Sequence, residues 1–167
     1  MTANVDVLLA RMADAERRLV EHASAPAPAG LTEPDPDGQE RWEAGQVWAH
    51  VAEFPAYWLD EVQRVIELGG TEPVPFGRVK TDAGRVEAIE RDRHESPAEL
   101  LARARSALAR ATDSARSLSP ESWELRGVHP TRGEMSVHRI IERFIVEHLE
   151  EHADQLDLLA GHGTRGR

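Results

Sequence analysis

Residues 144–156 read FIVEHLEEHADQL, and this stretch decides how the chain folds. Apolar residues recur at intervals of three and four from residue 137 to residue 159, which predicts an amphipathic helix. His148 and His152 stand on the apolar stripe of this helix, four residues apart. Residues at that spacing are neighbours on one helix face, so the two imidazoles can bind a single ion. The stretch therefore predicts a bundle helix that carries part of a metal site.

The pair differs from the zinc motif H-E-x-x-H, in which a glutamate follows the first histidine. Here Leu149 follows His148. The spacing of the ligands is kept, but the general base of the metalloproteases is missing. The sequence therefore argues against a protease of that kind.

Three further segments show the helical period, at residues 5–23, 43–68 and 96–118. Ser96 and Glu99 form a capping box at the start of the third segment. Ser136 is expected to cap the fourth helix, and Gly161 is expected to end it. No segment alternates with a period of two over a convincing length, so no strand is expected. These patterns predict an all-α four-helix bundle.

Long connections join the expected helices, at residues 24–39, 69–95 and 119–135. The first is rich in proline and cannot be helical. The second contains GRVEAIERDR at residues 84–93, which is compatible with a short helix. We expect these long loops to cover one end of the bundle.

Composition limits the kinds of function that the chain can have. Its 167 residues suit a single domain over 1–167. The absence of cysteine excludes disulfides, thiolate metal sites and a cysteine nucleophile. A net charge of −10 argues against nucleic-acid binding. The chain shows no apolar run long enough to span a membrane and no basic segment typical of a secretion signal. We therefore expect a cytoplasmic protein without a membrane partner.

A third histidine, His50, falls on the inward stripe of the second helix. With His148 and His152 it would complete a three-histidine set, which suits zinc with one coordination position left open. Nickel and ferrous iron also accept imidazoles. A shared ion would satisfy three buried imidazoles at once; the alternative is that each is hydrogen-bonded separately in the core. His129, in VHPTRG, is the one spare candidate for the site.

Two polar residues follow the predicted ligands by one helical turn. Glu53 follows His50, and Gln155 follows His152. Side chains at these positions can orient metal ligands by accepting a hydrogen bond from the other ring nitrogen. Exposure to solvent is the alternative for both.

Three segments of the sequence are similar to those of a known superfamily. The segments WEAGQVWAHVAEF at 42–54, HPTRGEMSVHRII at 129–141 and HLEEHADQL at 148–156 resemble the DinB-like superfamily. That group includes the YfiT-like metal-dependent hydrolases, thiol-dependent transferases and the metal-binding domain of mycothiol-dependent maleylpyruvate isomerase. The resemblance implies a four-helix bundle that holds a divalent metal through His50, His148 and His152. It also implies activity with a low-molecular-weight thiol such as mycothiol.

The first functional hypothesis is a metal-dependent S-transferase that joins such a thiol to an electrophilic small molecule. The isomerases carry an additional C-terminal domain, for which 167 residues leave no room, so the length favours a stand-alone transferase over maleylpyruvate isomerisation. Arg78, Lys80 and Arg85 are candidates for contacts with an anionic or sugar-bearing thiol. A role in solubility is the alternative for each of them.

Two other functions remain open. A hydrolase would use a metal-bound water, with Glu53 as the catalytic base. A non-catalytic bundle would bind metal or a partner in a stress response. A homodimer through the outer faces of the bundle is compatible with all three functions.

Overall fold

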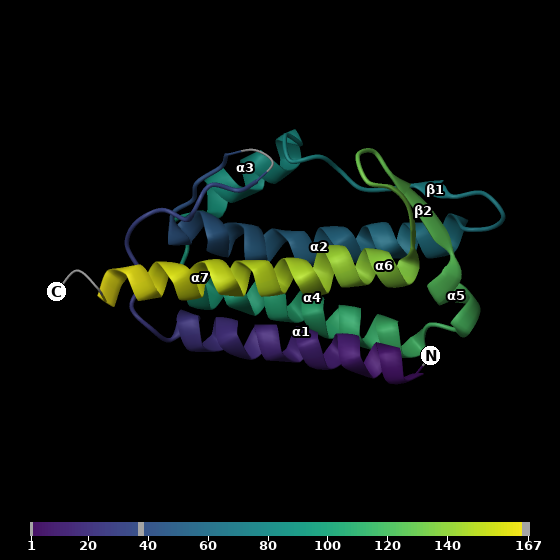
Figure 1. Ribbon diagram of the computed structural model, residues 1–167, viewed down its shortest axis with the longest axis horizontal. Coiled ribbons are helices and arrows are strands. Elements are labelled where there is room, and N and C mark those ends of the chain that lie inside the picture. The colour runs from purple at the N-terminus through teal and green to yellow at the C-terminus, as the bar shows by residue number, and fades with distance from the viewer. Residues whose placement is uncertain (1, 37–38, 165–167) are drawn as a thin grey trace.

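The computed structural model describes residues 2–36 and 39–164, most of which are helical. Three of the long rods are α1 (Thr2–Ala23), α2 (Ala44–Leu68) and α4 (Pro97–Ser117). The fourth is a continuous rod made of α6 (Val137–Ile141), η1 (Glu142–Glu147) and α7 (His148–Thr164). Figure 1 shows the four rods side by side with their long axes roughly aligned. The predicted four-helix bundle is confirmed.

The helix starts follow the capping signals in the sequence. Ser96 accepts a hydrogen bond from the backbone of Glu99, whose side chain returns to the backbone of Ser96. Ser136 likewise accepts from the backbone N–H of Arg139. Such caps satisfy amide donors that have no partner within the first turn of a helix. The capping residues therefore define where the third and fourth rods begin.

The core is formed by the apolar stripes of the four rods. Helix α2 is the central element, since it packs against α4 and against both α6 and α7. Its inward face carries large side chains that are almost fully buried: Val47, Trp48, Val51, Phe54, Trp58, Leu59, Val62 and Val65. Burial on this scale is what stabilises a helix in a globular protein. One polar side chain, His50, lies on this otherwise apolar face.

The expectation that no strand forms was wrong. A small sheet contains β1 (Val74–Pro75), β2 (Arg126–His129) and β3 (Gly133–Ser136) in that order. Strand β2 pairs parallel to β1 and antiparallel to β3. Strands of two to four residues are too short to produce a detectable alternation in the sequence. The sheet matters because its β2–β3 turn rises from the start of α6 across α2 (Figure 1), and Arg132 in this turn lies over the ring of Phe144 in the fourth rod.

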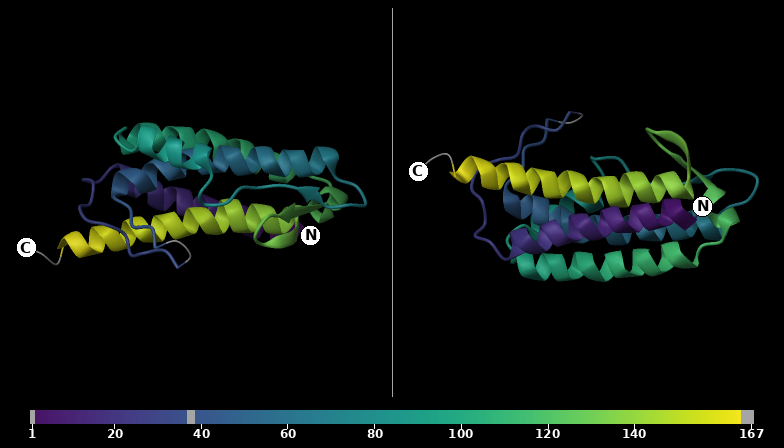
Figure 2. Two further views of the ribbon diagram at one scale, coloured as in Figure 1. Left: turned by 90° about the horizontal axis from the view of Figure 1, so that it is seen from above. Right: turned by 60° about the horizontal axis from the view of Figure 1, so that its bottom comes forward.

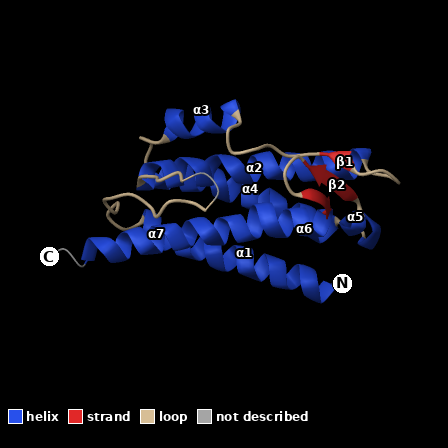
Figure 3. Ribbon diagram, turned by 45° about the horizontal axis from the view of Figure 1, so that its top comes forward, coloured by secondary structure: helices blue, strands red, loops and turns tan. Residues whose placement is uncertain are grey.

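The connections contain two short helices. Helix α3 (Ala83–Asp92) corresponds to the helix predicted in the second connection, and α5 (Pro120–Glu124) was not predicted. Figures 2 and 3 show that the first connection and α3 lie along the side of the bundle, over α2 and α7. The loops therefore cover a long face of the bundle rather than one end.

The fourth rod differs from the prediction at two points. It continues past Gly161 to Thr164, because glycine weakens a helix without necessarily ending it. It also contains the π-helical segment η1, in which the backbone hydrogen bonds span five residues. This wider turn comes directly before His148.

Across the described residues, every helix is either too short or too polar to cross a lipid bilayer.

Candidate metal centre

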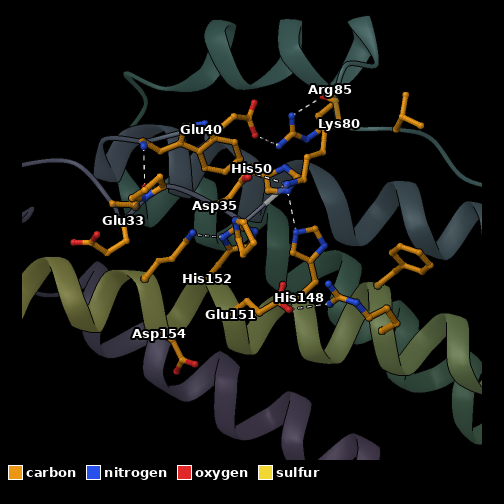
Figure 4. A pocket seen from close by; sticks show the side chains of 18 of the residues that line it. Glu33, Asp35, Glu40, His50, Lys80, Arg85, His148, Glu151, His152 and Asp154 are labelled. Carbon is orange, nitrogen blue, oxygen red and sulfur yellow. Dashed lines mark hydrogen bonds and ion pairs between the residues drawn. The ribbon is translucent and has the colours of Figure 1, made fainter. Parts of the chain in front are cut away.

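The three histidines predicted from the sequence lie together between α2 and α7. Their ring centroids are 5.0 Å apart for His50 and His148, 4.9 Å for His50 and His152, and 4.7 Å for His148 and His152. One ligand nitrogen from each ring lies within 4.8 Å of the other two. Figure 4 shows the three side chains pointing toward one another from the two helices.

Hydrogen bonds fix the orientation of two of these rings. The Nδ1 of His50 lies 2.8 Å from Oε1 of Glu53, and the Nδ1 of His152 lies 2.7 Å from Oε1 of Gln155. Both oxygens are acceptors, so each Nδ1 carries the proton. The Nε2 atoms of His50 and His152 therefore keep their lone pairs and present them to the centre of the cluster. Outer partners of this kind usually orient metal ligands in proteins.

The Nε2 atom of His152 is buried and has no hydrogen-bond partner among the described residues. The Nε2 atoms of His50 and His148 face each other at 3.1 Å. A buried nitrogen without a partner costs roughly 1–3 kcal/mol. A divalent cation would remove that cost by accepting the lone pair of His152 together with those of the other two rings. The residues present thus fit a metal ion.

Burial also holds the three imidazoles in the form that binds metals. Desolvation lowers the pKa values of His50 and His148 well below the usual value for histidine, and neighbouring histidines and arginines lower them further. Desolvation lowers the pKa of His152 to about 4, although its hydrogen bond to Gln155 acts in the opposite direction. All three rings are therefore neutral near pH 7, as ligation requires.

The lowered pKa of His152 predicts a loss of stability in acid for the metal-free protein. In the unfolded chain the imidazole of His152 has its usual pKa of 6.5, so it takes up a proton as the pH falls below this value, whereas in the folded protein it stays neutral until about pH 4. The folded state is therefore progressively destabilised relative to the unfolded state as the pH falls from 6.5 toward 4. From pH 7 to about pH 5.5 the loss due to His152 alone should be about 1 kcal/mol. Urea unfolding of metal-stripped protein at both pH values measures it.

His152→Leu is the matched control for this experiment, because the titrations of the carboxylates are common to both proteins. The decrease in the free energy of unfolding between pH 7 and about pH 5.5 should be smaller in the variant by about the same 1 kcal/mol. An equal loss in parent and variant would show that the ring of His152 does not titrate as described.

Aromatic rings pack against the histidines on two sides. Phe54 stacks on His148 with centroids 4.3 Å apart and an angle of 12° between the planes. Trp42 stacks on His152 at 6.0 Å and contacts His50 edge-on at 5.3 Å. The sequence analysis did not identify these contacts, although Phe54 follows His50 by one helical turn and could have been found from that spacing.

Glu53, predicted as a candidate catalytic base, is held from two sides. Its carboxylate accepts a hydrogen bond from His50 and two more from Nη2 of Arg78, at 2.5 Å to Oε1 and 2.7 Å to Oε2. The Arg78 guanidinium also lies 3.9 Å from the ring centroid of Tyr57. Burial raises the pKa of Glu53, and the ion pair with Arg78 opposes this shift. These contacts favour the orienting role of Glu53 over the role of a free base.

Arg85 and Lys80 connect the loops above the site. Arg85 is buried, and it donates to the backbone oxygen of Lys80 at 2.8 Å and to Glu40 at 3.2 Å. Its guanidinium lies 5.2 Å from the ring of Trp42. Lys80 pairs with Asp35 at 2.9 Å. These contacts join the first and second connections over the three histidines.

The histidines open into a cavity of about 920 Å³. Its walls come from the first connection, from residues 78–85, from the β2–β3 turn and from residues 143–159 of the fourth rod. His129 lines the cavity, away from the three-histidine cluster. Its Nε2 lies 3.2 Å from the backbone oxygen of Arg78, and its Nδ1 accepts from the backbone of Thr131 at 3.3 Å. Both ring nitrogens are thus occupied by contacts that hold the cavity wall together.

Fold and site together define a helical bundle with a candidate three-histidine metal centre at the base of a large cavity. The sequence model of the DinB superfamily matches residues 11–156, and the chain belongs to this superfamily.

Solved structures agree with this assignment. YfiT from Bacillus subtilis, described as a probable metal-dependent hydrolase with an unusual four-helix bundle topology, is similar with a TM-score of 0.70 at 19% identity, over 95% of this chain and 86% of that one. The mycothiol-dependent maleylpyruvate isomerase is similar with a TM-score of 0.67 at 14% identity, over 91% of this chain and 60% of that one. An uncharacterised protein from Clostridium difficile 630 is similar with a TM-score of 0.63 at 12% identity, over 94% of this chain and 95% of that one. No curated protein matches the chain.

Proposed function

We propose that the protein transfers a low-molecular-weight thiol of the mycothiol type to an electrophilic small molecule, with a divalent ion held by His50, His148 and His152. Zinc and nickel suit these ligands best. The observation that carries the proposal is the position of three neutral imidazoles, two of them oriented by hydrogen bonds, on a cavity of about 920 Å³. A cavity of this size accommodates a small-molecule ligand with room for a second reactant.

The comparison with the isomerase supports a thiol as the cofactor, since that protein is named as mycothiol-dependent. This chain spans only 60% of that protein, so its isomerase activity is not carried over. The bound ion would stabilise a thiolate, which is the nucleophilic form of a thiol. The chain contains no cysteine, so the attacking sulfur belongs to the cofactor. With an aryl chloride, the S–C bond forms, chloride leaves with the bonding electrons, and the thiol proton passes to solvent.

The residues around the site have separate roles in this proposal. Glu53 and Gln155 hold the rings of His50 and His152, and Arg78 holds Glu53. Trp42 covers two of the histidines and excludes water from that side. Lys80 and Arg85 line the cavity and are paired with Asp35 and Glu40, so they would offer an anionic or sugar-bearing thiol hydrogen-bond donors rather than an unpaired charge.

Hydrolysis is the second candidate, because the similar YfiT is described as a probable metal-dependent hydrolase. A hydrolase needs a base beside the reacting water. Glu53 is held by both Arg78 and His50, whereas Glu151 lines the cavity, is paired among the described residues with Arg143 alone and has a pKa raised by burial. Turnover of ester substrates without added thiol, lost in Glu151→Gln, would favour this function over thiol transfer.

The test of thiol transfer mixes metal-loaded protein, mycothiol and chlorodinitrobenzene, and follows the coloured thioether product. The parent should accelerate the reaction, and His148→Ala should reduce the rate to that of the uncatalysed mixture. His94→Ala changes an exposed histidine that does not line the cavity, and should leave the rate unchanged. Equal rates for the parent and His148→Ala would rule out the mechanism. Metal binding without turnover of thiol or ester substrates would leave a non-catalytic metal-binding protein.

A further inference from the structure

Five cationic side chains line the cavity, and four of them are neutralised by carboxylates. The four ion pairs are Arg78 with Glu53, Lys80 with Asp35, Arg85 with Glu40, and Arg143 with Glu147 and Glu151. The fifth is Arg132. Within the described part of the chain, no carboxylate lies within 4.0 Å of its guanidinium. Arg132 is therefore the cavity cation that is available to an anionic ligand.

Arg132 lies in the tight turn between β2 and β3, which carries it to the side of the fourth rod. Its guanidinium carbon is 5.9 Å from the ring centroid of Phe144. Its charge also contributes to lowering the pKa of His129 and opposes the rise in the pKa of Glu151. Glu151 is already paired with Arg143 at 3.0 Å. The positive charge of Arg132 thus faces the cavity without a partner of its own.

Beside Arg132 the cavity has an aromatic wall. Trp58 and Phe144 are stacked, with centroids 4.1 Å apart and planes at 18°. His129 stacks on the same Phe144 ring at 5.1 Å and 27°. All three side chains are at least 94% buried, and all three line the cavity. Aromatic rings prefer offset or edge-to-face contact with another ring, so the small part of each ring that reaches the cavity suits a planar, unsaturated ligand.

The wall leads directly to the candidate metal centre. Phe144 precedes His148 by four residues on the same rod, and His148 is stacked in turn against Phe54. A planar ligand on the wall would have one end beside Arg132 and the other directed toward the three histidines. This is the arrangement needed to present an electrophile to a thiolate at the histidines.

We propose that Arg132, His129, Trp58 and Phe144 form the electrophile subsite, and that it selects planar molecules carrying a carboxylate. The proposal rests on the proposed thiol transfer, since it assigns the second reactant of that reaction. Arg132 pairs with the carboxylate, and the aromatic wall receives the unsaturated skeleton. A guanidinium pairs with a carboxylate through two parallel hydrogen bonds, which fixes orientation as well as position.

Two aryl chlorides that differ by one carboxylate test the proposal, chlorodinitrobenzene and chlorodinitrobenzoate. The parent should have the higher kcat/KM with chlorodinitrobenzoate. Arg132→Met should reduce kcat/KM for this substrate by about tenfold, the low end of the range for a charge-assisted contact because Arg132 is exposed to solvent, and leave the neutral substrate unchanged. Arg132→Lys should retain part of the preference. Arg64→Met is the matched control, since Arg64 is exposed on α2 and does not line the cavity. An equal effect of Arg132→Met on both substrates, or no effect on either, would overturn the subsite.

A binding measurement separates failure of the subsite from failure of the proposed reaction. Dinitrobenzoate lacks the leaving group, so calorimetric titration of the metal-loaded protein reports binding alone. Binding that weakens about tenfold in Arg132→Met supports the subsite even if no electrophile is turned over. Binding that is absent in the parent, or equal in parent and Arg132→Met, overturns the subsite whether or not thiol transfer occurs. Binding lost only in His148→Ala would place the carboxylate on the metal and also overturn it.

Discussion

Purified without a polyhistidine tag, the parent protein is expected to carry about one divalent ion per chain, and His50→Ala almost none. The three imidazoles come from two helices, with one ligand nitrogen of each within 4.8 Å of the others. Removing His50 leaves two ligands on one helix and no contribution from α2. The loss of affinity should exceed the roughly 10–100-fold that follows removal of an outer partner of a ligand.

Elemental analysis of both proteins measures this effect and also identifies the ion. His94→Ala is the control, because it removes an exposed histidine and leaves the cluster intact. Thermal unfolding followed by circular dichroism shows whether His50→Ala is folded. A folded His50→Ala protein with the same metal content as the parent would contradict the assignment of His50 as a ligand.

The second large effect is expected from a residue that does not touch the ion. Glu53→Gln should weaken metal binding by roughly 10–100-fold. The substitution removes the charge that holds the Nδ1 proton of His50, and it leaves the largely buried guanidinium of Arg78 with only its longer 4.0 Å ion pair to Asp82. Competition with a chelating dye measures the affinity.

Arg78 allows the orienting role to be separated from a simple packing role. Arg78→Met keeps most of the side-chain volume and should weaken metal binding, whereas Arg78→Lys keeps the charge and should restore much of it. Glu67→Gln, on the exposed face of α2, is the neutral control. Metal binding by Glu53→Gln as tight as in the parent would show that the hydrogen bond to His50 is not needed.

The fold and the residues of the histidine cluster could be predicted from the sequence, because both depend on helical periodicity. Inward stripes recur every three to four residues, and a histidine on such a stripe is found by its position alone. The convergence of His50 with His148 and His152 follows once the two helices are adjacent. Glu53 and Gln155 follow from the same rule, one turn after the histidines that they orient.

The rest of the site depends on contacts between segments that are distant in the sequence. Arg78 and Arg85 were predicted to contact a thiol cofactor, and that role remains a proposal. Their positions, over Glu53 and Trp42, could not be read from the sequence because loop paths carry no periodic signal. The short β2–β3 hairpin was missed for the same reason, and with it the position of Arg132.

The wide turn η1, at Glu142–Glu147, has a consequence for how this site could have arisen and how easily it could be lost. A π-helical turn is a regular α-helix with one extra amino acid, and each residue of an α-helix advances the chain by about 100°. Deleting one amino acid here would let the turn relax to the regular form. Because the wide turn takes up its extra residue within itself, the helix on either side would keep its facing, and His148 and His152 should still point toward His50. A one-codon deletion at Glu150, in the regular α-helix that follows, would instead rotate His152 by about 100° relative to His148. The three-histidine cluster should therefore tolerate the loss of a residue from the wide turn but not from the helix after it.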